Sequence, residues 1–73
     1  MDDLLQLLGK RIKEERKKRG LTQEKLAELS GVSNTFISFI ESGNKNASLK
    51  TIKKIADVFQ ISLSDLFSEM TIA

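Results

Sequence analysis

The stretch QEKLAELSGVSNTFISFIE, residues 23–41, constrains the fold of this chain more than any other part of the sequence. Thr22, just before it, is a residue type that caps helices, and apolar residues follow at helical spacing. Gly31 can adopt the left-handed backbone conformation that ends a helix, and Ser33 can cap a second helix directly after it. The stretch therefore predicts two short helices joined by a tight turn.

Two short helices joined by a turn of about three or four residues that contains a glycine form a helix-turn-helix motif, whose second helix can enter the major groove of DNA. Ala27 is small where two such helices must cross closely, and Ile37 and Ile40 lie on one side of the second helix. A plain helical hairpin in a protein core would show part of the same pattern. The combined spacing of Ala27, Gly31 and the apolar residues after it favours DNA binding.

The rest of the chain predicts three further helices with short connections. The first begins at the acidic start of the chain and runs to about Arg19. Ser48 can cap a fourth helix with a continuous apolar stripe, and Ser62 can start a fifth. Residues 1–73 are therefore expected to form a single all-α domain, a compact bundle of five helices with the helix-turn-helix motif at about residues 22–42.

Composition argues against several classes of function. The chain has no cysteine and no histidine, so a zinc site or a Ser-His triad is close to excluded, and no metal or other cofactor is expected. An enzyme would need paired carboxylates in a pocket, whereas most acidic residues here belong to charged helical faces. No apolar run approaches the ~20 residues of a membrane span, and the acidic start does not resemble a signal peptide, so a cytoplasmic location is expected. No site for a small-molecule effector is evident.

The second helix of the motif is expected to present polar chemistry on the side opposite its buried stripe. Because each residue turns a helix by about 100°, Ile37 and Ile40 define that buried stripe. Asn34 can make a paired contact with an adenine edge, and Phe39 can pack on a thymine methyl group. The alternatives are a core or dimer contact for Phe39 and a mere helix-start residue for Asn34. The candidate base-reading residues are Asn34, Thr35, Ser38 and Phe39.

A second group of residues is suited to holding the DNA backbone. Gln23 opens the first helix of the motif, where free N–H groups attract anions. Ser33 is expected to act as a helix cap first and as a phosphate contact second. The loop after Gly43 and the start of the fourth helix supply the other candidates, which are Asn44, Lys45, Asn46 and Lys50. Such contacts supply affinity and register rather than sequence choice.

The segment RIKEERKKRGLTQEKLAELSGVSNTFISFIESG, continued by SLKTIKKIADVFQISLSDLF, resembles the phage repressor/Cro-like family of helix-turn-helix proteins, also called the XRE family. The motifs R-x-x-x-G-L-T-Q-x-x-L-A, S-G-V-S and I-E-S-G carry the resemblance. It implies a lambda-repressor-like domain that binds a palindromic operator as a homodimer and regulates transcription. It also implies a phosphate role for Gln23, base-reading roles for Asn34, Thr35 and Phe39, and an ion pair between Arg16 and Glu41.

The chain departs from the family pattern at Phe39, an unusual residue at a base-reading position, and in the loop after Gly43, which lacks the usual basic, proline-containing form. The resemblance extends to small regulators such as restriction–modification controller proteins, Cro-like phage repressors and antitoxins. An antitoxin or another protein-interaction module that can also bind DNA is therefore the main alternative. The dimer contacts are expected on the fifth helix, where the same side chains could instead close the monomer core: Leu63, Leu66, Phe67 and Met70.

Overall fold

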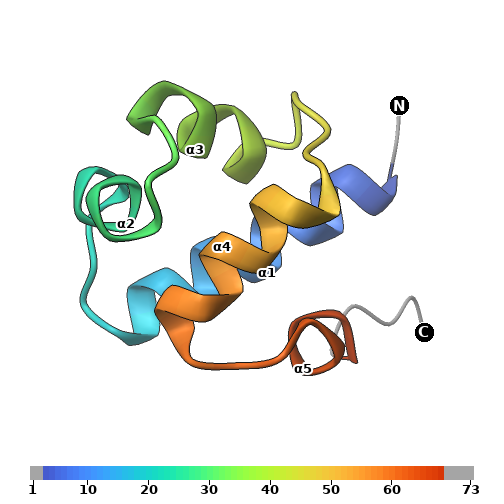
Figure 1. Cartoon of the computed structure of the whole chain (residues 1–73). Helices are drawn as coiled ribbons and strands as arrows, with labels where there is room; N and C mark the ends of the chain where they lie inside the picture. The colour runs from blue at the N-terminus through green and yellow to red at the C-terminus, as the bar shows by residue number, and fades with distance from the viewer. Residues whose placement is uncertain (1–2, 69–73) are drawn as a thin grey trace.

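The computed structural model describes residues 3–68, which form five α-helices and no strand (Figure 1). The helices are α1 (Asp3–Lys18), α2 (Gln23–Ser30), α3 (Asn34–Glu41), α4 (Leu49–Phe59) and α5 (Leu63–Ser68). The predicted all-α fold of five helices is confirmed. None of the described helices has the length and apolar composition that a membrane-spanning segment requires.

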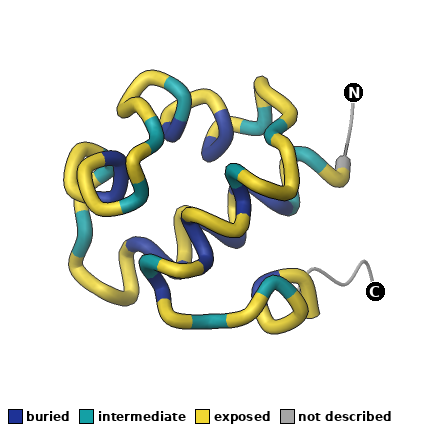
Figure 2. Tube along the Cα trace, in the orientation of Figure 1, coloured by how far each residue is buried: buried dark blue, intermediate teal, exposed yellow. Residues whose placement is uncertain are grey.

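The helices surround one apolar core to which all five contribute. α3 packs against α1 and α2, α2 also packs against α4, and α5 packs against α1 and α4 (Figure 1). The buried positions of α2, α3 and α5 lie on the sides that face the middle of the bundle (Figure 2). The fully buried side chains of the core include Ile12, Leu26, Ile37, Ile40, Ile52, Ile55 and Leu66.

Hydroxyl side chains begin the helices where the sequence predicts them. Thr22 Oγ1 accepts a hydrogen bond of 3.0 Å from the Lys25 N–H, and Ser33 Oγ accepts one of 3.1 Å from the Phe36 N–H. Each bond satisfies one of the N–H groups that the first turn of a helix leaves without a partner. Gly31 ends α2 with a φ of 74°, a left-handed conformation that glycine adopts without steric cost.

The fifth helix requires a correction to the predicted dimer contacts. Leu66 is fully buried inside the chain, so its side chain belongs to the core of the monomer and is not available to a partner. Leu63 is half-buried against that core, whereas Phe67 is 37% exposed. Met70 lies outside the described residues.

Gly9 allows α1 and the end of α3 to approach closely. A Cβ atom added at Gly9 would collide with the backbone carbonyl of Ile40 and would lie 2.7 Å from the Glu41 carbonyl oxygen. Backbone atoms cannot turn away as the end of a flexible side chain could, so this contact requires glycine. The sequence carried no obvious sign of it, because a glycine inside a helical pattern usually only weakens the helix.

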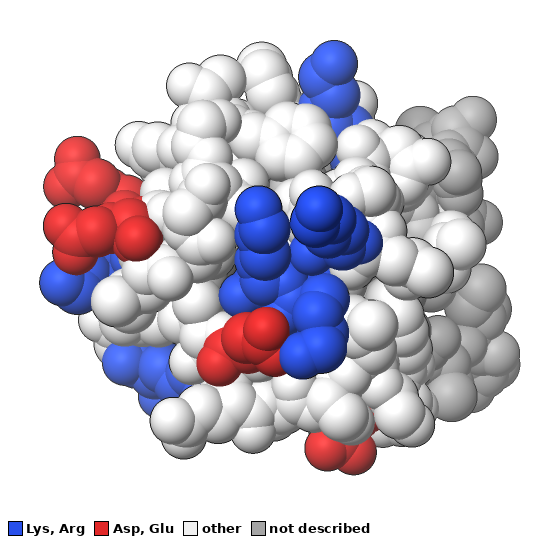
Figure 3. Space-filling model, in the orientation of Figure 1, with Lys and Arg blue, Asp and Glu red and all other residues white. Residues whose placement is uncertain are grey.

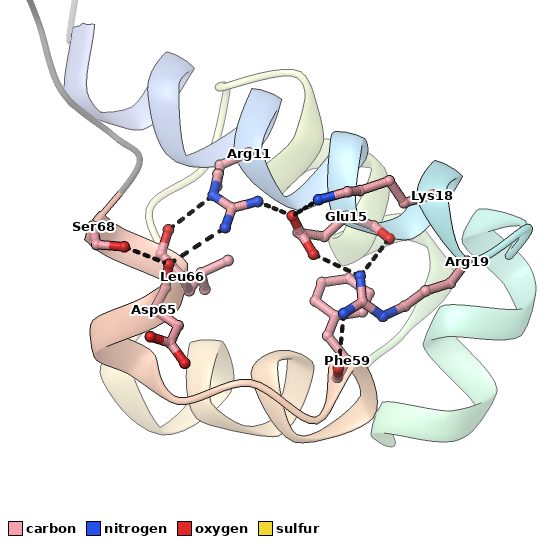
Figure 4. Close-up of polar contacts among 8 residues, drawn as sticks. All are labelled: Arg11, Glu15, Lys18, Arg19, Phe59, Asp65, Leu66 and Ser68. Atoms are coloured by element: carbon pink, nitrogen blue, oxygen red, sulfur yellow. Dashed lines mark hydrogen bonds and ion pairs between the residues drawn. The ribbon is translucent and has the colours of Figure 1, made fainter.

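Arg11 on α1 and Arg19 just after it bind the ends of other helices, whereas the lysines of α1 are exposed. Arg11 donates from Nε to the Leu66 carbonyl over 3.1 Å and from Nη2 to the Asp65 carbonyl over 3.3 Å (Figure 4). Arg19 donates to the Phe59 carbonyl over 2.9 Å, with its guanidinium 4.8 Å from the centre of the Phe59 ring. The two arginines thus bind carbonyl groups at the C-terminal ends of α5 and α4, where a cation is favourable.

Glu15 lies between Arg11, Lys18 and Arg19 and forms a cluster with these three cations. It is buried, and its carboxylate accepts hydrogen bonds from Arg11, from Arg19 over 2.6 Å and from Lys18 over 3.0 Å (Figure 4). Burial acts to raise the pKa of Glu15, but the hydrogen bonds from the three cations outweigh it and lower the pKa from 4.5 to about 2. The cluster therefore attaches α1 to the ends of two other helices through one ionised carboxylate.

Replacing Gly9 by alanine should destabilise the protein by about 1–3 kcal/mol, because the new methyl group would overpack against the α3 backbone. The sign is diagnostic, since alanine in place of glycine inside a free helix would stabilise that helix by about 1 kcal/mol. Chemical denaturation followed by circular dichroism measures the change. Lys10→Ala, at an exposed neighbouring position, is the control and should change the free energy of unfolding little. An increase in stability for Gly9→Ala would contradict the close approach.

The free energy of unfolding should fall as the pH is lowered from about 5 to about 2. The pKa of Glu15 is lower in the folded chain than in the unfolded chain, so the stabilisation is complete above the unfolded value and is lost as the pH falls through about 2. This difference corresponds to at most about 3 kcal/mol. Glu15→Gln should lower stability at pH 7 and lose most of this pH dependence, whereas Glu14→Gln, at an exposed position, should keep it. An unchanged pH profile in Glu15→Gln would refute this role for the carboxylate.

Candidate nucleic-acid interface

The outer face of α3 carries the four residues predicted to read bases. Asn34, Thr35, Ser38 and Phe39 are all exposed, while Ile37 and Ile40 on the same helix are buried. Spacings of three and four residues place the four side chains next to one another on one helical face. The α3 helix lies at the outer edge of the bundle (Figure 1). The structure therefore brings these four residues together, and their contacts with bases stay a prediction.

Phe39 is the most apolar part of this face, and 42% of its surface is exposed. The predicted alternative, in which Phe39 belongs to the core, does not fit this exposure. Phe36, three residues earlier, is the phenylalanine that packs partly buried against the core. A surface phenyl group on an otherwise polar helical face is suited to contact with an apolar partner group such as a thymine methyl.

The residues predicted to contact phosphates lie in four separate places. Gln23 is half-buried at the first position of α2, and Ser33 is the exposed cap of α3. The side chains between α3 and α4 are exposed, namely those of Asn44, Lys45 and Asn46. Lys50 instead lies on α4 and shares that helix's exposed face with Lys53 and Lys54. Basic side chains gather over α4 in the space-filling view, with acidic atoms beside them (Figure 3).

Arg16 and Glu41 make a bidentate ion pair between α1 and α3. Arg16 Nε lies 2.7 Å from Glu41 Oε2, and Arg16 Nη2 lies 3.0 Å from Glu41 Oε1. The third nitrogen, Nη1, donates to the Leu21 carbonyl over 2.7 Å in the turn between α1 and α2. Both charged side chains are buried, with exposed fractions of 9% for Arg16 and 2% for Glu41. The pair therefore fixes the end of α3 relative to α1 and to the turn that leads into the motif.

Gln23 is joined to this ion pair. Its Nε2 donates a hydrogen bond of 3.1 Å to Glu41 Oε1, the oxygen that also accepts from Arg16 Nη2. Sequence reasoning placed Gln23 at a phosphate and Glu41 in a structural pair, but did not connect them. No local pattern could have done so, because the two residues are 18 positions apart and meet only when α2 and α3 are packed.

Two short helices, with a left-handed glycine in the turn between them and a polar outer face on the second, form a helix-turn-helix motif. The model of the helix-turn-helix family HTH_3 matches residues 12–66. The chain therefore belongs to the XRE-type helix-turn-helix family, as the sequence resemblance predicted.

Relatives of this chain are named as regulators. It is 38% identical over 71 residues to control protein C.MunI of a Mycoplasma species, a match that covers 96% of each chain. It is 43% identical over 61 residues to the HTH-type transcriptional regulator PuuR of Escherichia coli K12, which corresponds to 84% of this chain and 33% of PuuR. The chain thus spans about one third of the length of that regulator.

A solved structure of a related controller protein superposes closely on the fold. The crystal structure of the restriction–modification controller protein C.Esp1396I, as a tetramer in complex with its natural 35 base-pair operator, matches with a TM-score of 0.88. Sequence identity is 31%, and the match covers 96% of this chain and 92% of the controller protein chain.

Arg16→Ala and Glu41→Ala should each destabilise the fold by about 3–5 kcal/mol, because either change leaves a buried charge without its partner. The double variant Arg16→Met/Glu41→Leu should recover most of this loss, since it removes both charges and fills their space. The free energy of unfolding from urea denaturation measures all three. Lys25→Ala, which breaks an exposed ion pair with Glu28, is the control and should leave stability nearly unchanged. Equal losses in the single and double variants would contradict the argument from buried charge.

Proposed function

We propose that this chain is a sequence-specific DNA-binding regulator of transcription that binds a palindromic operator as a homodimer, with α3 in the major groove. The observation that carries the proposal is the exposed face of α3, where polar side chains and one phenyl group stand opposite the buried Ile37 and Ile40. Membership of the helix-turn-helix family and the operator complex of C.Esp1396I support it. Such a regulator acts in the cytoplasm and needs no catalytic residue.

In this proposal each exposed residue of α3 makes a different kind of contact with DNA. Asn34 lies in the first turn, where recognition helices meet base edges, and its amide pairs with an adenine. Thr35 and Ser38 donate to or accept from bases and phosphates. Phe39 contacts a thymine methyl group, which also removes its exposed phenyl surface from water.

The backbone contacts come from both sides of α3. Gln23 and the first N–H groups of α2 meet one phosphate, and Ser33 can donate its hydroxyl proton to another while its oxygen remains the helix cap. Beyond α3, the exposed side chains of the loop meet the other strand: Asn44, Lys45 and Asn46. Lys50 reaches phosphate only where the DNA extends toward α4.

The homodimer is proposed to form through the exposed side of α5. Phe67 keeps 37% of its surface exposed and Leu63 is half-buried, so both retain apolar surface that a second copy can cover. Leu66 supports this surface from below by its packing in the core. Two copies related by a two-fold axis would place their recognition helices in half-sites about one turn of DNA apart.

Selection of bound duplexes from a random DNA pool should enrich a near-palindromic sequence, and the affinity for that sequence should fall as the salt concentration rises. Asn34→Ala should relax the consensus at one position per half-site, with a loss of discrimination of about 1–3 kcal/mol. Gln23→Ala should weaken all sites alike, because phosphate contacts carry no sequence information. Failure to enrich any sequence would refute the regulator and favour a protein-interaction module, such as an antitoxin, instead.

A further inference from the structure

The side-chain amide of Gln23 has a defined orientation in the free protein. The acceptor at 3.1 Å is a carboxylate oxygen of Glu41, which can only accept hydrogen bonds when ionised. The amide oxygen would be repelled in that place, so Nε2 must face Glu41. One of the two Nε2 protons is thereby taken, and the other remains to donate to a further acceptor.

The negative charge of Glu41 is balanced where it meets Gln23. Both carboxylate oxygens accept from Arg16, and the exposed fraction of the Glu41 side chain is only 2%. An unpaired carboxylate beside the DNA backbone would repel phosphate, whereas Glu41 and Arg16 together carry no net charge. Gln23 is half-buried, so its amide lies between this buried pair and the surface of α2.

We propose that Glu41 is a positioning residue for DNA binding: it holds the Gln23 amide so that the second Nε2 proton points at a backbone phosphate. The proposal rests on the proposed function and deepens it. Free glutamine side chains lose rotamer freedom when they bind, and a side chain already held in place loses less. Arg16 completes the arrangement by neutralising the carboxylate and by holding the turn that leads into α2.

A double-mutant cycle on operator affinity tests this coupling. Gln23→Ala should weaken operator binding about tenfold in the natural chain, as expected for a hydrogen bond to a charged group. In the Glu41→Gln background the same change should cost no more than about threefold, because a glutamine can turn either its amide oxygen or its NH2 group toward Gln23 and no longer fixes the orientation of the Gln23 amide. Glu28→Gln is the matched control, since it makes the same chemical change at an exposed residue of α2. In the Glu28→Gln background, Gln23→Ala should still weaken operator binding about tenfold. Anisotropy titration of the selected duplex measures each affinity.

The outcomes separate the two proposals. An equal cost of Gln23→Ala in the natural and Glu41→Gln backgrounds would overturn the positioning role while leaving the phosphate contact intact. If Gln23→Ala does not weaken operator binding in the natural chain, the phosphate contact itself is refuted. If no operator sequence is selected, the proposed regulator function is refuted. The cycle can be repeated in Arg16→Met/Glu41→Leu, which also lacks the carboxylate.

A measurement on the natural chain decides the geometry even where the Glu41 variants do not fold. In NMR spectra of the free protein, one Nε2 proton of Gln23 should be shifted downfield and should exchange more slowly with water than the Nε2 protons of Gln60, which is exposed. The second proton of Gln23 should respond when operator is added. Nε2 protons of Gln23 with the chemical shifts and the rapid exchange of those of Gln60 would overturn the proposal.

Discussion

The buried pair of Arg16 and Glu41 is the interaction on which the arrangement of the motif depends. Removing two charges from water is expensive, and the loss is offset only where the geometry satisfies both groups. Here the guanidinium meets both carboxylate oxygens and the Leu21 carbonyl, and Gln23 adds a fourth hydrogen bond. Among the described residues, no buried side-chain nitrogen or oxygen lacks a partner. Such a network has one good geometry, so it sets the position of α3 relative to α1 and α2 more sharply than apolar packing alone would.

All three arginines of the chain make hydrogen bonds to other groups of the protein. Arg16 pairs with Glu41, while Arg11 and Arg19 meet Glu15 and the carbonyl ends of α5 and α4. The planar guanidinium can bind several acceptors in fixed directions, which suits it to joining helices. The exposed positive charge comes mostly from lysines, with Arg19 partly exposed, and the face proposed for base contact carries no lysine or arginine. A modest net charge of +2 is consistent with recognition that relies on amide and hydroxyl contacts as well as on lysine.

Features that depend on neighbouring residues could be predicted from the sequence, whereas features that depend on packing between distant segments could not. The capping roles of Thr22 and Ser33 and the exposed face of α3 follow from residue type and from the helical period, which act over a few neighbouring residues. Leu66 shows the limit, because Leu63, Leu66 and Phe67 share one apolar side of α5 and only packing against α1 and α4 decides which of them is covered. The burial of Glu15 was not predicted, since a charged side chain is almost never buried unless it is paired.

The sequence by itself determined the number and order of the helices, the left-handed turn at Gly31 and the side of α3 that faces outward. These features depend on backbone conformation and on hydrophobic periodicity, and the residue types of short segments determine both. Only the tertiary structure decided that Gly9 must lie against the α3 backbone, that Glu15 is buried among three cations, and that Gln23 binds Glu41. The physical reason is that hydrogen bonds and steric contacts act over a few ångströms in space. Residues far apart in the chain can make them only after the helices have packed.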